Sequence, residues 1–228
     1  MFQVDENLWI FDGPNIRFMT LDIPTRMTIA RLQSGLWVHS PIPLNTEIKD
    51  FVSTYGPVAQ VVAPNNLHHL YVDAWISEYP DADFVAAPGL REKRTDLAFT
   101  SDLRPGQTYS WSGDIDHAHF VGNRFLEEAV FFHKESKTLI LTDLILNLKT
   151  SGYSAWQRAF ARFDGVAYPD GMSPRFFRWS MRNRTAARTC YEQMIAWEPE
   201  KVVISHGECM LENGTEEVRN RLGWVMSN

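Results

Sequence analysis

The segment Val61–Leu70, VVAPNNLHHL, ends an apolar run with turn residues and then presents two adjacent histidines. The β-branched run before Pro64 is typical of a buried strand, and Pro-Asn-Asn is typical of the turn that ends one. His68 and His69 therefore lie just past the carboxyl end of a predicted strand. Because α/β proteins commonly bind ligands at that edge of a sheet, both histidines are candidate site residues.

The elements predicted on either side of this segment favour a mixed sheet covered by helices. Short strands separated by Gly, Pro and Ser breaks predict an antiparallel meander over residues 8–44. Helices and strands then alternate, with a long segment rich in Phe, Trp, Arg, Gly and Pro, residues 148–180, expected to form helical pieces and loops over one edge. Helices are expected at 46–56, 69–79, 184–199 and 215–227, the last capped by Thr215, and strands at 58–64, 81–89, 117–123, 127–136, 137–146 and 201–208.

The composition is that of a folded protein of one domain, which we place at residues 1–228. The chain has 44% hydrophobic and 22% charged residues, enough to bury a core. Its net charge of −6 argues against a nucleic-acid partner. No run reaches the roughly 18 apolar residues that a membrane span needs, and the amino terminus lacks the order of a secretion signal. We therefore expect a cytoplasmic protein with a small-molecule substrate, no membrane partner, and an oligomeric state that the sequence leaves open.

Two further candidate residues follow predicted strands in the same way as the histidine pair. Asp143 ends TLILTD, and His206 follows KVVIS and precedes Gly207. Imidazole and carboxylate groups bind zinc or iron, and such a set suffices for a catalytic site with an open position. Each residue alone has an ordinary alternative, as a hydrogen-bonded structural histidine or a turn-capping aspartate. Their shared place at strand ends favours the metal site.

This order of strand with histidines, strand with aspartate, and strand with His-Gly resembles the metallo-β-lactamase superfamily. The stretches LWVHSPIPL (36–44), APNNLHHL (63–70), EEAVFFHKESKTLILTD (127–143) and ISHGE (204–208) are similar to a poorly characterised metallo-hydrolase-like branch. The resemblance covers nearly the whole chain. It implies an α/β fold, an αββα sandwich of two mixed β-sheets with helices on the outer faces.

The superfamily's metal motifs are only partly present. Its first motif, His-x-His-x-Asp-His, places Pro64 and Asn66 where the first two histidines belong, and its central Gly-His motif has no counterpart before residue 127. The resemblance therefore implies one divalent metal, zinc with iron as the alternative, instead of two. The ligands that it implies are His68 and His69 in the first motif, Asp143 at the bridging aspartate and His206 at the late histidine.

The adjacent acids Glu127 and Glu128 could replace a lost ligand. Side chains alternate along a strand, so only one of them can face the site. The resemblance favours Glu128 as a metal ligand. The alternative is a solvated carboxylate at a strand end.

The function that these residues imply is a metal-dependent hydrolase using a metal-bound hydroxide on an ester, thioester, lactone or phosphodiester, with Asp143 as the catalytic residue. Asn66, Trp75 and Arg175 are the candidate substrate contacts, with Arg175 meeting an anionic group. Trp75 at helical spacing also suits a core position. Two alternatives stay open: a catalytically inactive binding or regulatory module, and a mononuclear iron oxidoreductase.

Overall fold

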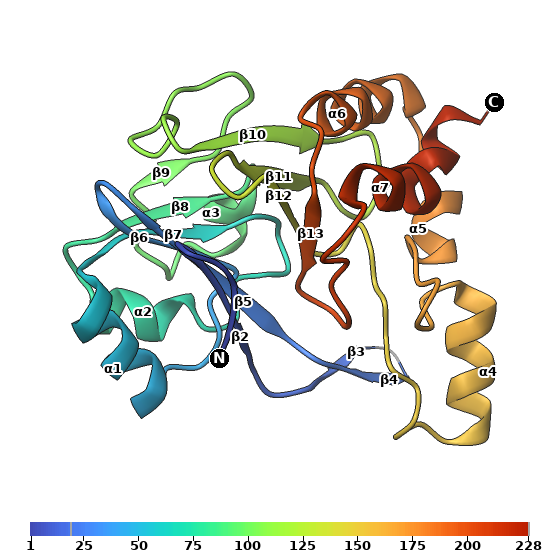
Figure 1. The fold of residues 1–228 in the computed structure, drawn as a ribbon, viewed down its shortest axis with the longest axis horizontal. Helices are drawn as coiled ribbons and strands as arrows, with labels where there is room; N and C mark the ends of the chain where they lie inside the picture. The colour runs from blue at the N-terminus through green and yellow to red at the C-terminus, as the bar shows by residue number, and fades with distance from the viewer. Residues whose placement is uncertain (19, 228) are drawn as a thin grey trace.

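The computed structural model describes residues 1–18 and 20–227, which form two packed β-sheets with helices on their outer faces (Figure 1). The first sheet has the order β1-β2-β5-β6-β7-β8-β9. Its first four strands pair antiparallel, and pairing is parallel from β6 onward. Its strands are β1 (Phe2–Asp5), β2 (Leu8–Asp12), β5 (Arg26–Leu32), β6 (Gly35–His39), β7 (Val58–Ala63), β8 (Asp83–Ala86) and β9 (Ser101–Asp102).

The second sheet has the order β10-β11-β12-β13. Strands β10 (Ile115–Phe120), β11 (Glu128–His133) and β12 (Thr138–Leu141) form an antiparallel meander, and β13 (Lys201–Ile204) joins β12 in parallel. Strands β7, β12 and β13, which the sequence places before the candidate ligands, therefore belong to two different sheets. The mixed sandwich predicted from the sequence is confirmed.

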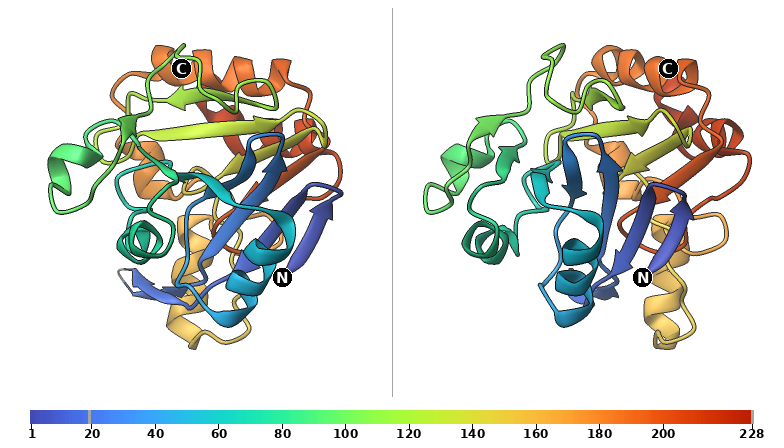
Figure 2. Two further views of the ribbon diagram at one scale, coloured as in Figure 1. Left: turned by 90° about the vertical axis from the view of Figure 1, so that its left-hand side faces the viewer. Right: turned by 60° about the vertical axis from the view of Figure 1, so that its left-hand side comes forward.

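Helices cover both outer faces of the sandwich, as the views in Figure 2 show. Apolar clusters lie under each helical layer and between the two sheets, so the central strands of both sheets are buried. Helices α1 (Thr46–Tyr55), α2 (Val72–Glu78) and α3 (Leu90–Lys93) accompany the first sheet; α6 (Arg184–Ala196), α7 (Gly214–Leu222) and the 3-10 turn η1 (Gly223–Met226) cover the second.

Helix α1 illustrates how local sequence produces these elements. The side chain of Asn45 accepts a hydrogen bond from the Ile48 N–H at 2.9 Å, which satisfies an otherwise free donor of the first turn. Ile48, Phe51 and Val52 share one face and are buried against the first sheet. The helix ends at Gly56.

A separate hairpin, β3 (Ile16–Phe18) and β4 (Leu21–Ile23), leaves the first sheet. Its apolar residues pack with those of the segment after β12 and of helix α4 (Ala155–Asp164), in a cluster that includes Leu21, Leu148 and Ala161. Helix α5 (Arg175–Trp179) follows nearby. The predicted meander is therefore interrupted, because Ile16, Leu21 and Ile23 find their apolar partners among residues 146–167 instead of in the sheet.

The start of α7 also differs from the prediction. Asn213, at φ +55°, occupies the cap position, and Thr215 lies inside the helix, where its hydroxyl donates to the Pro199 carbonyl at 3.0 Å. Among residues 1–18 and 20–227, no helix combines the length and apolar character needed to cross a bilayer.

Candidate metal centre

Three side chains from three loops meet at one edge of the sandwich. His68 lies in the loop after β7, Asp143 follows β12 by two residues, and His206 follows β13 by two residues. One ligand atom from each lies within 4.8 Å of those of the other two. The cluster therefore joins the first sheet to the second at the carboxyl ends of their strands, as the sequence predicts.

The two imidazoles face different oxygens of the Asp143 carboxylate and also lie close to each other. The His68 Nε2 lies 3.1 Å from Asp143 Oδ2, the His206 Nε2 lies 3.2 Å from Asp143 Oδ1, and the two Nε2 atoms are 3.2 Å apart. Ligands of a tetrahedral zinc ion at ~2.0–2.1 Å are separated by roughly 3.3 Å. The spacing of the three side chains is therefore close to that of the ligands around one tetrahedral ion, which would leave a fourth position for water or substrate.

The other nitrogen of each imidazole is held by a hydrogen bond. His206 Nδ1 donates to the Pro24 carbonyl at 2.7 Å, and His68 Nδ1 lies 2.6 Å from the Ser40 hydroxyl. Metal-binding histidines typically have such a partner, since it fixes the tautomer and the ring orientation. Both rings are thereby set to present Nε2 to the centre of the cluster.

The charges in the cluster are strongly coupled. Although burial favours a neutral carboxyl, the imidazoles of His68 and His206 hold the pKa of Asp143 well below its ordinary value. Burial likewise opposes the charge on His206, yet Asp143 raises the pKa of that imidazole above its ordinary value. The site thus favours a positive charge beside Asp143, which a bound cation would supply in place of a proton.

Asn65, which the sequence analysis did not single out, links the two halves of the site. Its side chain is fully buried, and its Nδ2 donates to Asp143 Oδ2 at 2.7 Å and to the Thr142 hydroxyl at 3.0 Å. Its Oδ1 accepts the N–H groups of Leu67 and His68 at 2.8 and 3.1 Å. The Pro-Asn-Asn turn signal was visible in the sequence, since asparagine side chains commonly bond the backbone two residues on. Its link to Asp143 is a tertiary contact.

Glu128 lies behind the Asp143 loop and is outside the three-residue group. It is buried, and its carboxylate accepts the N–H groups of Thr142 and Asp143, each at 2.7 Å. Burial, followed by the nearby charge of Asp143, raises the pKa of Glu128 to about 7. The structure thus contradicts the solvated alternative. It gives Glu128 a role in holding the backbone that carries Asp143, while its role as a metal ligand stays a prediction.

The structure does not bring His69 to the group. Its Nδ1 lies 2.6 Å from the Arg94 Nη1, and Arg94 in turn binds Asp96 at 2.6 Å. His69 therefore contacts Arg94, in the segment after α3, and not the Asp143 cluster. Adjacent residues in a loop seldom point the same way, and only His68 has its ring directed to Asp143.

The three candidate substrate contacts lie in different surroundings. Trp75 is fully buried in the core and its indole N–H donates to the Ile42 carbonyl at 2.9 Å, so it is a core residue and not a wall of the site. Asn66 lies in the site loop, where its carbonyl accepts from the Lys93 ammonium at 2.6 Å. The guanidinium of Arg175 lies 4.4 Å from the Phe163 ring centroid, on the surface formed by α4 and α5.

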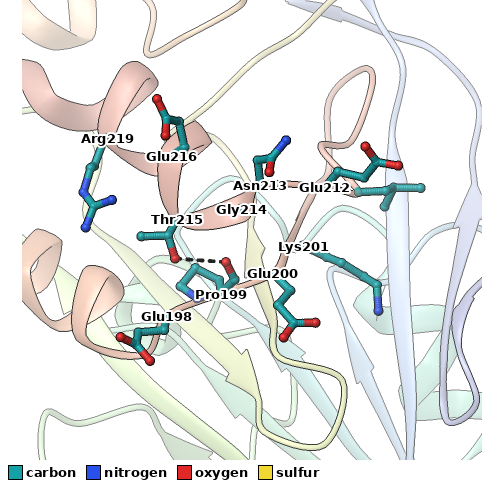
Figure 3. A pocket seen from close by; sticks show the side chains of 11 residues that line it. Glu198, Pro199, Glu200, Lys201, Glu212, Asn213, Gly214, Thr215, Glu216 and Arg219 are labelled. Carbon is teal, nitrogen blue, oxygen red and sulfur yellow. Dashed lines mark hydrogen bonds between the residues drawn. The ribbon is translucent and has the colours of Figure 1, made fainter.

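Two cavities lie elsewhere on the molecule. One, of about 630 Å³, lies at the start of β13 and at the first turn of α7, and Glu198, Glu200 and Glu216 are among its lining residues (Figure 3). The other, of about 760 Å³, runs along β10 and α6. His68, Asp143 and His206 line neither of them. The first cavity lies at the opposite end of β13 from His206.

Comparison of the fold with solved structures gives metallo-β-lactamases over the whole chain. DIM-1 metallo-β-lactamase has a TM-score of 0.69 at 11% identity, covering 99% of this chain and 95% of its own. The metallo-β-lactamase from Pontibacter korlensis has a TM-score of 0.66 at 11% identity, covering 100% and 98%. FIM-1 from Pseudomonas aeruginosa, solved in a mono-zinc form, has a TM-score of 0.65 at 12% identity, covering 97% and 92%. The fold is therefore metallo-β-lactamase-like, as the sequence resemblance implies.

Comparison of the sequence with known proteins identifies one family. No curated protein matches the chain. One family model matches residues 5–159, a range that includes His68 and Asp143 but ends before His206. Because that match spans more than half of the chain, the protein belongs to the family described as Domain of unknown function (DUF4336).

Proposed function

We propose that the protein is a hydrolase that depends on one divalent cation, with zinc as the expected metal. The observation that carries this proposal is the cluster of His68 Nε2, His206 Nε2 and the Asp143 carboxylate. Each imidazole nitrogen lies 3.1 to 3.2 Å from one Asp143 oxygen and 3.2 Å from the other imidazole, and the far nitrogen of each ring is already hydrogen-bonded. A set of two imidazoles and one carboxylate with an open position suits zinc and also iron(II).

Each residue of the site would have a distinct role in such a hydrolase. A cation bound there would act as a Lewis acid and lower the pKa of a water molecule toward neutrality. His68 and His206 would bind it as neutral donors, and Asp143 would supply the balancing negative charge. Asn65 and Glu128 would keep Asp143 in place through its carboxylate and its backbone N–H. The substrates that this chemistry suits are esters, thioesters, lactones and phosphodiesters.

One metal is favoured over two. Pro64 has no donor atom at the position where the resemblance would place a histidine, and Asn66 has only an amide. Over residues 1–18 and 20–227, the three-residue group is the one cluster of at least three His, Cys, Asp or Glu side chains with ligand spacing. Both observations support a mononuclear site.

The test is to titrate metal-free protein with zinc and to compare wild type with Asp143→Asn. We expect about one tight equivalent for the wild type and a large loss of affinity for the variant, because the amide keeps the shape but loses the charge. Asp170→Asn, at an exposed position, is the matched control and should bind like wild type. Circular dichroism reports whether each variant is folded.

Activity is then measured on the zinc-loaded protein with a panel of esters, thioesters, lactones and phosphodiesters. Turnover that requires zinc and is lost in Asp143→Asn supports the proposal. Iron in the purified protein, with oxygen-dependent turnover, would replace it with the iron oxidoreductase. A wild type that binds neither metal would leave the inactive binding module as the function of this site.

A further inference from the structure

The segment from residue 155 to residue 188 carries a charge opposite to that of the rest of the protein. It contains seven arginines, no lysine and two aspartates, hence a net charge of +5. The chain as a whole carries −6, which leaves −11 on the remaining residues. Such an asymmetry points to an anionic partner for this part of the molecule.

Helix α4 in this segment turns apolar side chains toward solvent. Its buried residues are Ala161 and Asp164, whereas Trp156 and Phe163 are 55% and 58% exposed. Trp156, Ala159 and Phe163 are spaced by three and four residues, so they form one stripe on the helix. A helix of a water-soluble protein normally exposes few large apolar side chains, whereas α4 exposes both Trp156 and Phe163.

Arg175 extends this stripe from α4 to α5. Its guanidinium lies 4.4 Å from the centroid of the Phe163 ring and 5.7 Å from that of Trp179. Trp179 is 73% exposed, the highest value among the large exposed hydrophobic residues of the described chain. The exposed rings are thus interleaved with cationic groups. We call the residues Trp156, Ala159, Arg162, Phe163, Arg175 and Trp179 the aromatic-arginine face.

We propose that the aromatic-arginine face docks on a lipid bilayer that carries anionic headgroups. Indole and phenyl rings partition to the boundary between headgroups and acyl chains, and guanidinium groups bind lipid phosphates with paired hydrogen bonds. A bilayer therefore satisfies both the apolar rings and the positive charge of the face at once. Neither the exposed rings nor the positive charge would by itself point to a bilayer.

The shape of this region favours a bilayer over a nucleic acid. Helix α4 lies at the lower edge of the molecule in every view, beyond the two sheets (Figures 1 and 2). Proteins that bind single strands by stacking usually enclose the backbone in a positively charged groove. The residues of the aromatic-arginine face line neither of the two cavities described above.

This proposal differs from the expectation of no membrane partner. That expectation rests on the lack of a spanning segment, and docking on a surface needs none. The contact requires only that exposed rings and arginines lie together, and the rings of Phe163 and Trp179 are brought to the same guanidinium by the fold.

The experiment is co-sedimentation of the full chain with vesicles of phosphatidylcholine alone or with roughly 30% phosphatidylserine, since anionic lipid supplies the attraction to basic residues. We expect binding to the anionic vesicles, weak binding to the neutral ones, and a loss of binding as salt is raised. Arg162→Gln should weaken binding roughly fivefold, the effect of one basic residue near an anionic surface.

Matched controls separate the face from general charge and hydrophobicity. Arg219→Gln on α7 removes an exposed arginine elsewhere, and Phe2→Ser removes an aromatic ring that is 51% exposed. Both should bind like wild type, whereas Trp179→Ser should bind much more weakly. The mutated side chains on the face are exposed, so the variants should fold, and circular dichroism checks this.

Any one of the following outcomes would overturn the proposal. The first is no binding to anionic vesicles at low salt. The second is equal weakening by Trp179→Ser and Phe2→Ser, which would place the contact elsewhere. The third is tighter binding to a single-stranded oligonucleotide than to vesicles, or a dimer that Trp179→Ser dissociates, which would assign the face to a nucleic acid or to a second copy of the chain.

Discussion

The ligands of the candidate metal centre are oriented by residues that carry no metal chemistry of their own. Ser40, in a left-handed conformation at φ +56°, holds His68 Nδ1, and the carbonyl of Pro24 holds His206 Nδ1. Asn65 bonds both the His68 backbone and the Asp143 carboxylate. A histidine that lacked such partners would sample other rotamers, so these contacts turn three strand-end residues into one site.

Replacing Asn65 by alanine tests this positioning. The change removes the Asn65 donor from Asp143 Oδ2 and leaves the N–H groups of Leu67 and His68 without their acceptor. We expect zinc affinity to fall by about 10–100-fold, the usual cost of removing an outer partner of a ligand. Titration of zinc into metal-free protein measures the change.

Asn66→Ala is the control for the Asn65 variant, because it removes the same group one residue along the loop. Within the described part of the chain the Asn66 Oδ1 has no hydrogen-bond partner. Equal losses of affinity in the two variants would mean that the whole loop, and not the bond from Asn65 to Asp143, sets the site.

At the scale of elements, the loop after β13 must pass very close to the segment after β12. The Asn147 N–H donates to the His206 carbonyl at 3.0 Å, and the Glu208 N–H donates to the Asn147 carbonyl at 2.9 Å. Gly207 lies between them at φ +101°, where a Cβ would collide with the Asn147 backbone. Arg26 supports the same loop by donating to the carbonyls of Ile204 and Gly207.

Gly207→Ala should therefore displace His206. Its φ disfavours any residue with a side chain, and the added methyl group forces the two segments apart. We expect a loss of about 1–3 kcal/mol in the free energy of unfolding, together with weaker zinc binding. Urea unfolding of the metal-free variant and a zinc titration measure the two effects separately.

Gly113→Ala provides the comparison for Gly207→Ala. A Cβ at Gly113 would meet no described atom within 4 Å, and its φ is not in the left-handed region. This variant should unfold and bind zinc like wild type. If Gly207→Ala did the same, the close approach of the two segments would not be what places His206.

At the scale of the whole molecule, the centre bridges the two sheets. His68 comes from the first sheet, and Asp143 and His206 come from the second. A cation held there binds the folded chain and not the unfolded one, so it should raise the stability of the sandwich. Stability of the protein without metal should depend on other groups, among them the half-buried His119 of β10.

Acid should destabilise the metal-free protein through His119. Burial lowers the pKa of this imidazole from 6.5 to about 4, so between these values the unfolded chain binds a proton that the folded chain does not. The contribution of His119 to stability is therefore complete above the unfolded pKa of 6.5 and is lost as the pH falls toward 4. Urea unfolding in the presence of a chelator, at about pH 7.5 and about pH 5, measures the difference, which should be smaller in His119→Asn. An unchanged difference in the variant would exclude His119 as a source.

The sequence alone determined where strands end and which residues stand at those ends. Alternation, β-branched runs and turn residues are local properties, so the helix at residue 46, the hairpin of β11 and β12, and the positions of His68, Asp143 and His206 were predictable. The abundance of Phe, Trp and Arg in residues 148–180 was also visible as composition. Their arrangement into one face was not.

Only the tertiary structure decided which of these residues meet. His68 and His69 are adjacent and chemically identical, and the choice between them depends on Ser40 from β6 and on Arg94 beyond α3. Trp75 and Glu128 are buried because the core and the Asp143 loop surround them. Direction of a side chain in a loop depends on partners distant in the chain, and no local pattern carries that information.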